Sequence, residues 1–390
     1  MKKPPKTPEK SYLGYEIDFH RGGTRTDNSL TKLSSFWEKF NKNYNNPYIG
    51  NKKKLIKFLV DTIIEKYNIQ YDSFLDLFSG SSYVSMAIKK IHKKVITNDL
   101  LTSSYFNAIA YIKNKDISLS QEDIKDLFTF PKEEPPHFIN EKYLNRFSKR
   151  EINIIESYFE RIDKLWGNPL KEDMKAVLAT VFMQNYIMDC CFVGGRLNNG
   201  QILAKYEHRV KHQRNRGLEM FNNDTDKNGI SYKDMKFLEP LYPQDKNIHE
   251  CYNMDAIDFL TTIHPIVDLC YIDPPYGGDQ SDYGYMYSFL EELIYRESYE
   301  DIKKNRDGDS RFTSGKKYRD NFDELMGKVS YIPNLIISYN SSSWGTIEEI
   351  CDVIKKYRSN IVVEEFLYSY KYRNKSKEDK AKEYVIVVKE

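Results

Sequence analysis

The chain has 390 residues, which is enough to bury a large core in one large domain or two smaller ones. Its 59 Lys and Arg residues almost balance its 57 Asp and Glu residues, so the formal net charge is only +2. This composition excludes a protein that holds nucleic acid through its overall charge. A DNA-binding chain of this kind has to cluster its basic residues locally.

The five cysteines form no CxxC pair and no Cys/His cluster with the spacing of a zinc site, and their number is odd. We therefore expect neither a bound metal nor a disulfide framework. The N-terminus lacks the apolar core of a secretion signal, and no apolar run is long enough to span a membrane. These features predict a reduced, cytoplasmic protein without a membrane partner.

The first 45 residues are polar and contain several prolines, which is typical of an N-terminal arm. Apolar residues then recur at helical spacing between 55 and 64, so we expect a helix that starts near Lys52. Asn51 can cap this helix, and Gly50 allows a ligand to approach the backbone. A helix start that carries a lysine suits an anionic group, although a capped surface helix is the simpler alternative.

An α/β unit is predicted between residues 73 and 99. A short apolar strand leads to Asp76 and is followed by small residues at 79–82 and by a helix through Ile88. Such a turn lets a ligand approach a helix start, and the absence of a following Gly-Lys-Ser/Thr argues against a phosphate-binding loop. A second strand then ends at Asp99, and an acidic residue at this place in nucleoside-binding folds accepts hydrogen bonds from ribose hydroxyls.

Residues 117–249 are dense in charge and weak in strand signals, and they contain two predicted helices at 150–165 and 173–186. They also hold the strongest local basic cluster, in which Asn, Gln and Tyr alternate with Lys and Arg as base and phosphate contacts require. Its basic residues, with the nearby Arg196, are Lys205, Arg209, Lys211, Arg214 and Arg216. A solvated basic helix is the alternative to DNA contact.

The most informative stretch runs from Ile266 to Gly278. An apolar run rich in branched residues predicts a buried strand, and two prolines stop it. Asp273 and the carbonyl of Pro274 offer hydrogen-bond acceptors to an amino group, and Tyr276 offers a flat face to a planar base. Open α/β sheets bind their ligands at this carboxyl end of the strands, although an ordinary Pro-Pro turn is the alternative.

The C-terminal part is predicted to complete the sheet. The glycine- and tyrosine-rich segment 277–285 is expected to be a loop that closes over an extruded base. Residues 303–319 are expected to be a flexible basic segment, either a DNA clamp or simply a mobile loop. The last two predicted strands form an antiparallel hairpin whose basic tip includes Lys371 and Arg373. The strands predicted after position 300 are 334–340, 361–368 and 384–388.

Three segments, in this order, resemble the motifs of the alpha-type DNA adenine-N6 methyltransferases. They are Tyr48-Ile49-Gly50-Asn51-Lys52, Asp76-Leu77-Phe78-Ser79-Gly80 and Asp273-Pro274-Pro275-Tyr276. The resemblance implies an α/β, Rossmann-like S-adenosylmethionine-dependent methyltransferase fold. That fold has a seven-stranded, mostly parallel sheet with an antiparallel C-terminal hairpin, and here an inserted, mainly helical recognition domain. Ser82 departs from the family pattern, which has a second glycine at that position.

The resemblance also implies roles for the matching residues. Asp255 would bond the adenine amino group of S-adenosylmethionine, with Asp258 as the neighbouring alternative. Tyr276 would stack on a target adenine flipped out of the duplex, while Asp273 and the Pro274 carbonyl accept its two N6 hydrogens. No metal is needed. The implied cofactor-binding residues are Tyr48, Gly50, Lys52, Asp76, Phe78, Gly80, Asp99, Asp255 and Asp273.

The order of the motifs puts the target-recognition insertion at 117–249, between the parts of the catalytic domain at 46–116 and 250–390, with the arm at 1–45. The implied partner is double-stranded DNA. The implied setting is a bacterial or phage restriction-modification system with a separately encoded restriction endonuclease, and we expect a monomer or a weak dimer. The expected DNA contacts are Arg196, Lys205, Arg209, Lys211, Arg214, Arg216, Lys371 and Arg373.

Three alternatives remain at the level of sequence. An RNA adenine-N6 methyltransferase shares the Asp-Pro-Pro-Tyr tetrapeptide, although the N-terminal motif and the long insertion favour DNA. An N4-cytosine methyltransferase would more often carry serine at position 273. A non-catalytic, specificity-type DNA-binding subunit is the alternative from another class, and the intact Asp99, Asp273 and Tyr276 argue against it.

Overall fold

The structure is a computed structural model that describes most of the chain from Ile64 to the C-terminus. The described segments are 64–91, 93–128, 137–145, 149–193, 196–197, 245–275, 282–306, 310–313, 315–341, 343–367 and 382–390, together with Lys52, Ile56 and Leu59. Within these segments no helix is both long and apolar enough to cross a membrane. The predicted arm at 1–45 lies outside the described residues.

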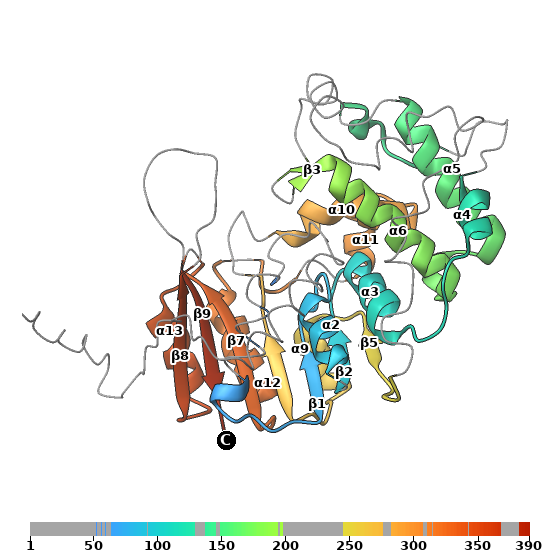
Figure 1. The fold of residues 1–390 in the computed structure, drawn as a ribbon. Coiled ribbons are helices and arrows are strands. Elements are labelled where there is room, and N and C mark those ends of the chain that lie inside the picture. The colour runs from blue at the N-terminus through green and yellow to red at the C-terminus, as the bar shows by residue number, and fades with distance from the viewer. Residues whose placement is uncertain are drawn as a thin grey trace, which may run out of the picture.

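A seven-stranded sheet forms the centre of the molecule, with the strand order β5-β2-β1-β6-β7-β9-β8 (Figure 1). The neighbours from β5 to β7 pair in parallel, and β9 pairs antiparallel with both β7 and β8. The predicted mostly parallel sheet with an antiparallel C-terminal hairpin is confirmed. The strands are β1 Ser73–Asp76, β2 Lys94–Asn98, β5 Glu250–Tyr252, β6 Leu269–Ile272, β7 Asn334–Asn340, β8 Ile361–Leu367 and β9 Lys382–Val388.

The continuous apolar run of β6 follows from burial on both faces of the sheet. Leu269 and Tyr271 pack into the core on one face, while Cys270 and Ile272 pack into the core on the other. Alternate residues of a strand point to opposite faces, so a central parallel strand needs apolar residues at every position. This is why the strand before Asp273 reads as an unbroken apolar segment rather than as an alternating one.

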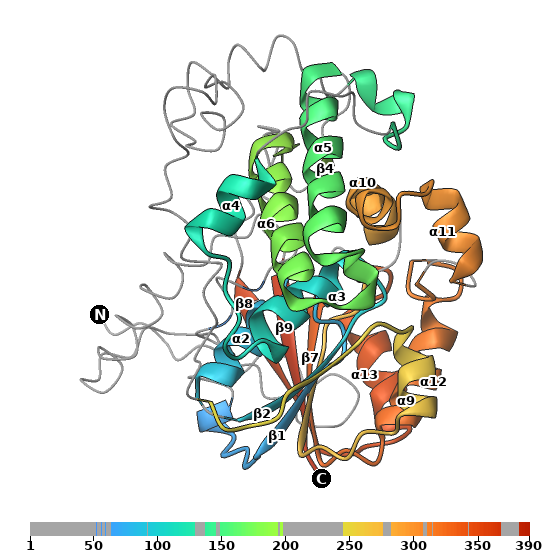
Figure 2. The ribbon, with the colours of Figure 1, turned by 90° about the vertical axis from the view of Figure 1, so that its right-hand side faces the viewer.

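Helices cover both faces of the sheet (Figure 2). Helices α2 and α3 pack on one face, where Tyr83 and Phe106 enter the core, and α9, α12 and α13 pack on the other. The bounds of these helices are α2 Tyr83–Lys90, α3 Thr102–Ala108, α9 Ala256–Thr262, α12 Tyr318–Val329 and α13 Ile347–Lys355. A π-helical turn, Ile109–Lys113, continues α3.

A second group of helices lies above the sheet in Figure 1, beyond the carboxyl ends of its parallel strands. Two of its members confirm the helices predicted at 150–165 and 173–186. The group consists of α4 Gln121–Leu127, α5 Lys149–Trp166, α6 Met174–Cys191, α10 Tyr283–Tyr295 and α11 Tyr299–Asn305. Short helical turns at Glu141–Asn145 and Pro169–Lys171 and a small antiparallel pair of strands, β3 Phe192–Val193 and β4 Arg196–Leu197, accompany it.

Two features differ from the expectations for these regions. Strand β5 was not predicted, because it has only three half-buried residues at the edge of the sheet and carries no apolar run. The predicted loop at 277–285 is wrong for its last residues, since Tyr283, Gly284 and Tyr285 form the first turn of α10. Asp282 caps this helix by accepting a hydrogen bond from the Tyr285 N–H at 2.8 Å.

Candidate active site

A cavity opens at the carboxyl ends of β1, β2, β5 and β6, where an open α/β sheet binds its ligands. It encloses about 910 Å³, part of which is open to solvent. Asp76 ends β1, and Asp99, Asp255 and Asp273 follow the ends of β2, β5 and β6, so each of the four strands brings an aspartate to the cavity wall. The polar residues of the lining are Lys52, Asp76, Ser79, Ser81, Asn98, Asp99, Asp255, Asp273, Tyr271, Tyr283, Tyr299, Ser310 and Thr313.

Asp99, in the loop after β2, connects this loop to the turn after β1 by hydrogen bonds. The Gly80 N–H donates to Asp99 Oδ2 at 2.7 Å, and the Leu101 N–H donates to Asp99 Oδ1 at 2.9 Å. Gly80 has a φ of 47°, a left-handed conformation that glycine adopts without strain. Each carboxylate oxygen has two lone pairs, so Asp99 can still accept hydrogen bonds from a ligand in the cavity.

Ser82 stands where the family pattern has a glycine, and its backbone keeps a conformation that favours glycine. It precedes α2 with a φ of 57°, again left-handed, and its hydroxyl makes no cap hydrogen bond to the helix. The side chain is fully buried, and within the described residues its Oγ has no hydrogen-bond partner. A glycine would fit this position better than the serine that occupies it.

Replacing Ser82 by glycine should therefore raise the free energy of unfolding by about 1 kcal/mol. The substitution removes the strain of a left-handed backbone at a non-glycine residue and removes a buried hydroxyl without a partner among the described residues. Together these gains outweigh the greater conformational entropy that glycine gives the unfolded chain. Urea denaturation followed by circular dichroism measures the change. The matched control is Ser81→Gly, because Ser81 has no left-handed strain to relieve, and it should lower the stability. An unchanged or lowered stability of Ser82→Gly contradicts the prediction.

Asp76 lies at the floor of the cavity and is almost fully buried. Its Oδ2 accepts a hydrogen bond from the Ser85 hydroxyl at 2.6 Å, whereas its Oδ1 has no partner among the described residues. Burial raises the pKa of Asp76 to about 7, and the nearby carboxylates of Asp273 and Asp99 add to this rise. Burial likewise raises the pKa of Asp99 to about 6. A cation that enters beside these two carboxyls favours their ionised form, which only accepts hydrogen bonds.

The predicted catalytic aspartate forms an ion pair with the predicted cofactor-binding lysine. Lys52 Nζ lies 3.1 Å from Asp273 Oδ1 and 3.0 Å from Glu383 Oε1, and its side chain is 9% exposed. Asn340 on β7 donates to the other carboxylate oxygen of Glu383 at 3.1 Å. Glu383 was not predicted as a site residue. The available signal was the carboxylate of Glu383 directly before the apolar residues of the last strand.

The remaining predicted residues of the cavity wall have clear structural partners. Asp255 caps α9 by accepting from the Ile257 N–H at 3.0 Å, and burial raises its pKa. Phe78 packs edge-to-face on Phe312, with ring centroids 5.4 Å apart. Asp258, the alternative to Asp255, is paired with Arg311 at 2.5 Å and does not line the cavity.

Two arginines of the basic segment predicted at 303–319 form ion pairs in the part that the structure describes. Arg306 pairs with the buried Glu291, and Arg311 pairs with Asp258 and lies 3.5 Å from Asp255. No local pattern in the sequence indicates these pairs, because the acidic partners lie elsewhere in the chain, on α9, at its N-terminal cap and on α10. Through these ion pairs both arginines stabilise the wall of the cavity.

Within the Asp-Pro-Pro-Tyr segment the described residues end at Pro275, and only the backbone of Arg196 is described. Pro274 is buried next to Pro275, which lines the cavity. Arg196 lies in β4, but its side chain is outside the description. The predicted residues outside the described segments are Tyr48, Gly50, Tyr276, Lys205, Arg209, Lys211, Arg214, Arg216, Lys371 and Arg373. The roles assigned to all of these residues stay predictions.

The cavity is acidic in its described lining, with four carboxylates, those of Asp76, Asp99, Asp255 and Asp273, against one lysine. Within the described residues, no group of three or more His, Cys, Asp or Glu side chains has the arrangement of a metal site. The carboxylates are instead separated around the wall. Such a lining suits an elongated ligand that carries positive charge together with hydroxyl or amino groups.

Comparisons with known proteins agree with this site. Residues 48–189 match the family model of the D12 class N6 adenine-specific DNA methyltransferases. The chain is 26% identical over 347 residues to the type II methyltransferase M2.HphI of Haemophilus parahaemolyticus, and the alignment covers 87% of this chain and 96% of that protein.

Two further relatives are longer than this chain. It is 24% identical over 365 residues to the type II methyltransferase M.FokI of Planomicrobium okeanokoites. It is 24% identical over 346 residues to the modification methylase LlaI of Lactococcus lactis subsp. lactis. The alignments cover 87% and 81% of this chain but 52% and 50% of those proteins, so the chain spans about half their length.

The matched segment contains the lysine of the ion pair, the first two strands and the aspartates that follow them, which form one half of the cavity wall. The other half comes from the strand that leads to Asp273 and from Asp255. The names of the family and of the relatives favour a DNA methyltransferase over an RNA-modifying enzyme and over a non-catalytic specificity subunit. Over residues 48–189 the chain is thus similar to the D12 class of N6 adenine-specific DNA methyltransferases, and its relatives named above are type II methyltransferases and a modification methylase.

Proposed function

We propose that the cavity binds S-adenosylmethionine and that the chain transfers its methyl group to N6 of a specific adenine in duplex DNA. The observation that carries the proposal is the position of Asp273. It ends the central strand β6, faces the same cavity as Asp76 and Asp99, and is paired with Lys52 at 3.1 Å. The acceptor of the target amino group and the proposed donor site thus share one cavity.

The residues present fit the methyl donor. The cavity floor contains buried acceptors without partners among the described residues, Asp76 Oδ1 and Asn98 Oδ1. We propose that Asp76 faces the ammonium group of the donor, that Asp99 accepts from its ribose hydroxyls, and that Asp255 accepts from its adenine amino group. When bound, S-adenosylmethionine supplies a methyl group activated by a positively charged sulfur.

The proposed role of Asp273 is to orient and activate the target nitrogen. Its carboxylate and the main-chain carbonyl of Pro274 accept the two N6 hydrogens, which directs the nitrogen lone pair at the methyl carbon. The new nitrogen–carbon bond forms as the carbon–sulfur bond breaks, and the nitrogen then loses one proton to its acceptor or to water. Lys52, supported by Glu383, holds the Asp273 carboxylate in place for this task.

The target base must leave the duplex to reach this cavity, because its amino group is inaccessible in the stack. We propose that Tyr276 stacks on the flipped adenine and that the insertion at 117–249 reads the target sequence. The names of two relatives, which are type II methyltransferases, support a place in a type II restriction-modification system. We propose a separately encoded endonuclease as the other part of that system. The EC class of a site-specific adenine methyltransferase follows from the same proposal.

Binding of the methyl donor should strengthen as the pH rises from 5.5 to 8. Asp76 and Asp99, with pKa values of about 7 and about 6, are protonated at the lower end of this range and ionised at the upper end. A cationic ligand prefers the ionised carboxylates, so the affinity should increase roughly tenfold or more.

Isothermal titration calorimetry across this pH range measures the effect. At pH 6, titrations in buffers of different ionisation enthalpy should also reveal proton release on binding. The variant Asp76→Asn is the control, since it removes the group with the higher pKa and should flatten the dependence. An affinity that is constant or that falls with rising pH would contradict the proposed positions of these carboxylates.

The function itself is tested by transfer of a tritiated methyl group from S-adenosylmethionine to unmethylated duplex DNA, followed by digestion to nucleosides. Label in N6-methyladenine supports the proposal. Label in N4-methylcytosine, or in structured RNA supplied as a competitor, overturns the proposed target. Sequencing of the methylated DNA then identifies the recognition site.

A further inference from the structure

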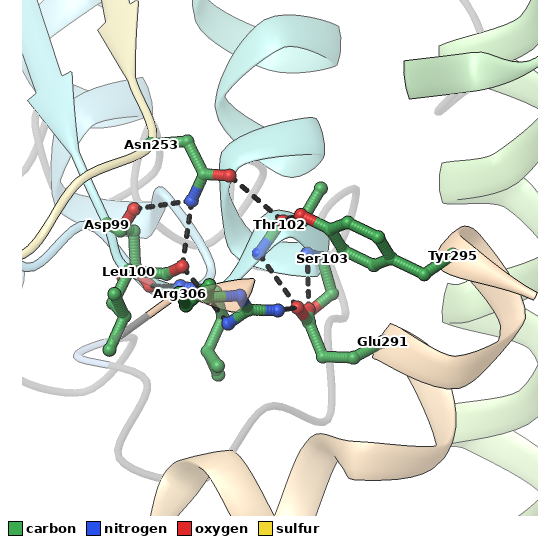
Figure 3. A network of polar contacts seen from close by, with 9 residues as sticks. Asp99, Leu100, Thr102, Ser103, Asn253, Glu291, Tyr295 and Arg306 are labelled. Carbon is green, nitrogen blue, oxygen red and sulfur yellow. Dashed lines mark hydrogen bonds and ion pairs between the residues drawn. The ribbon is translucent and has the colours of Figure 1, made fainter. Parts of the chain in front are cut away.

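A buried ion pair fastens the loop that carries Asp99 to the helices beyond the sheet. Glu291 on α10 has no exposed surface, and its carboxylate accepts from the N–H groups of Thr102 at 3.2 Å and Ser103 at 2.7 Å. Its charge is balanced by Arg306 at the end of α11 (Figure 3). Helix α3 is therefore capped by a side chain that is 189 residues away from Thr102 in the sequence.

The carbonyl groups of this loop, the segment 99–103, are also hydrogen-bonded. Asn253, which follows β5, donates from Nδ2 to the carbonyls of Asp99 and Leu100, each at 2.8 Å. Arg306 donates to the Leu100 carbonyl at 3.3 Å. The Thr102 hydroxyl joins the two sides, since it donates to Asn253 Oδ1 at 2.9 Å and hydrogen-bonds the Tyr295 hydroxyl at 2.8 Å. Figure 3 shows these groups converging on the segment 99–103.

This arrangement needs an explanation other than stability alone. A helix start is ordinarily capped by a local Ser, Thr, Asp or Asn, but the residue before α3 is Leu101, which makes no side-chain cap. Leu101 lines the cavity instead. A buried ion pair is also no more stabilising than apolar residues of similar volume would be. What the pair adds is a fixed position for the loop relative to α10 and α11.

We propose that Glu291 and Arg306 are positioning residues of the methyl-donor site, which hold the segment 99–103 so that Asp99 presents its carboxylate to the ribose. The inference rests on the proposed function of the cavity. The Arg306 guanidinium also balances the Glu291 charge near Asp99. Burial is the main reason why the pKa of Asp99 is raised to about 6, and Glu291 adds to that rise.

The test is a double variant, Glu291→Met with Arg306→Met, which removes both charges and keeps the volume similar. The dissociation constant for S-adenosylhomocysteine, measured by calorimetry, should rise about tenfold. The protein should stay folded with a lower thermal midpoint, because the N–H groups of Thr102 and Ser103 lose their acceptor. In steady-state transfer to DNA, KM for the donor should rise by a similar factor and kcat at saturating donor should change less than twofold. A role in stability alone would not produce this separation.

The control is Asp163→Asn, which weakens another ion pair of this region, the contact of Asp163 with Arg296 at 3.2 Å. Neither Asp163 nor Arg296 lines the cavity, so the donor affinity should not change. If the double variant does not fold, Arg306→Lys decides. A lysine keeps the charge but cannot reach both Glu291 and the Leu100 carbonyl, and the dissociation constant should rise severalfold.

The possible results separate this inference from the proposed function. The positioning role is overturned if the folded double variant binds S-adenosylhomocysteine with the affinity of the wild type. The same holds for a folded Arg306→Lys variant, where it replaces the double variant. A wild-type protein that binds neither S-adenosylmethionine nor S-adenosylhomocysteine overturns the proposed function itself.

Discussion

The variant Asp273→Asn is expected to transfer methyl groups roughly 10³-fold more slowly than the wild type. The asparagine keeps the shape of the side chain, but its amide nitrogen is a donor and repels an N6 hydrogen that the carboxylate would accept. The substitution also removes the charge that pairs with Lys52, but the substrate contact that it changes is the proposed one with the reacting nitrogen, so the effect on transfer should fall on kcat. Single-turnover transfer of tritiated methyl groups to duplex DNA measures it directly.

The control for this prediction is on the same strand. Asp268 lies just before β6, at the end opposite to Asp273, and its carboxylate accepts from the Ser73 N–H at 2.8 Å. Asp268→Asn should lower the stability but leave methyl transfer intact. The Asp273→Asn variant should also still bind duplex DNA and S-adenosylhomocysteine. Full activity of Asp273→Asn would remove the proposed mechanism, and loss of all binding would mean that the substitution had damaged the fold.

The parts of the fold that the sequence predicted well are those with a local signal. The strand before Asp273 has an apolar residue at every position, because both faces of the sheet are covered, and this run is visible without any knowledge of its neighbours. The turn after β1 was recognised from its small residues. The structure adds the reason for them, since Gly80 and Ser82 both have left-handed backbones.

The parts that were missed depend on contacts between distant segments. Lys52 and Glu383 are separated by 331 residues, so no local pattern indicates that they meet. Arg306 reads as part of an exposed basic run until the fold brings Glu291 next to it. Strand β5 exists because its three residues pair with β2 at the edge of the sheet, and such a short segment has no periodicity to detect.

Helix α10 shows how these distant contacts organise the site. Its first turn lines the cavity through Tyr283 and Gly284, and Glu291 in its later part caps α3. The next residue, Glu292, pairs with Lys142 at 2.7 Å in the region predicted as the recognition insertion. Helix α10 thus contacts the segment 99–103 on one side and this region on the other.

The second large effect is expected for Lys52→Met. The substitution leaves the carboxylates of Asp273 and Glu383 without the ammonium group that lies within 3.1 Å of both. Removing one partner of a buried ion pair is costly, so the free energy of unfolding should fall by about 3 kcal/mol. Methyl transfer should fall roughly 10²-fold, because Asp273 loses the group that holds its carboxylate toward the target nitrogen. Chemical denaturation and single-turnover transfer measure the two effects separately.

A second substitution distinguishes the structural role of Lys52 from its role in the reaction. Adding Glu383→Gln removes one of the two facing carboxylates, so the double variant should regain most of the lost stability while its transfer rate stays low. The control is Lys66→Met, which breaks another lysine–glutamate pair of the C-terminal hairpin, with Glu364 at 2.6 Å. Lys66 is 34% exposed but Glu364 is only 2% exposed, so the loss of Lys66 should also lower the stability, by about 1–3 kcal/mol, and leave transfer unchanged. If the double variant regained its transfer rate together with its stability, Lys52 would serve the fold and not the chemistry.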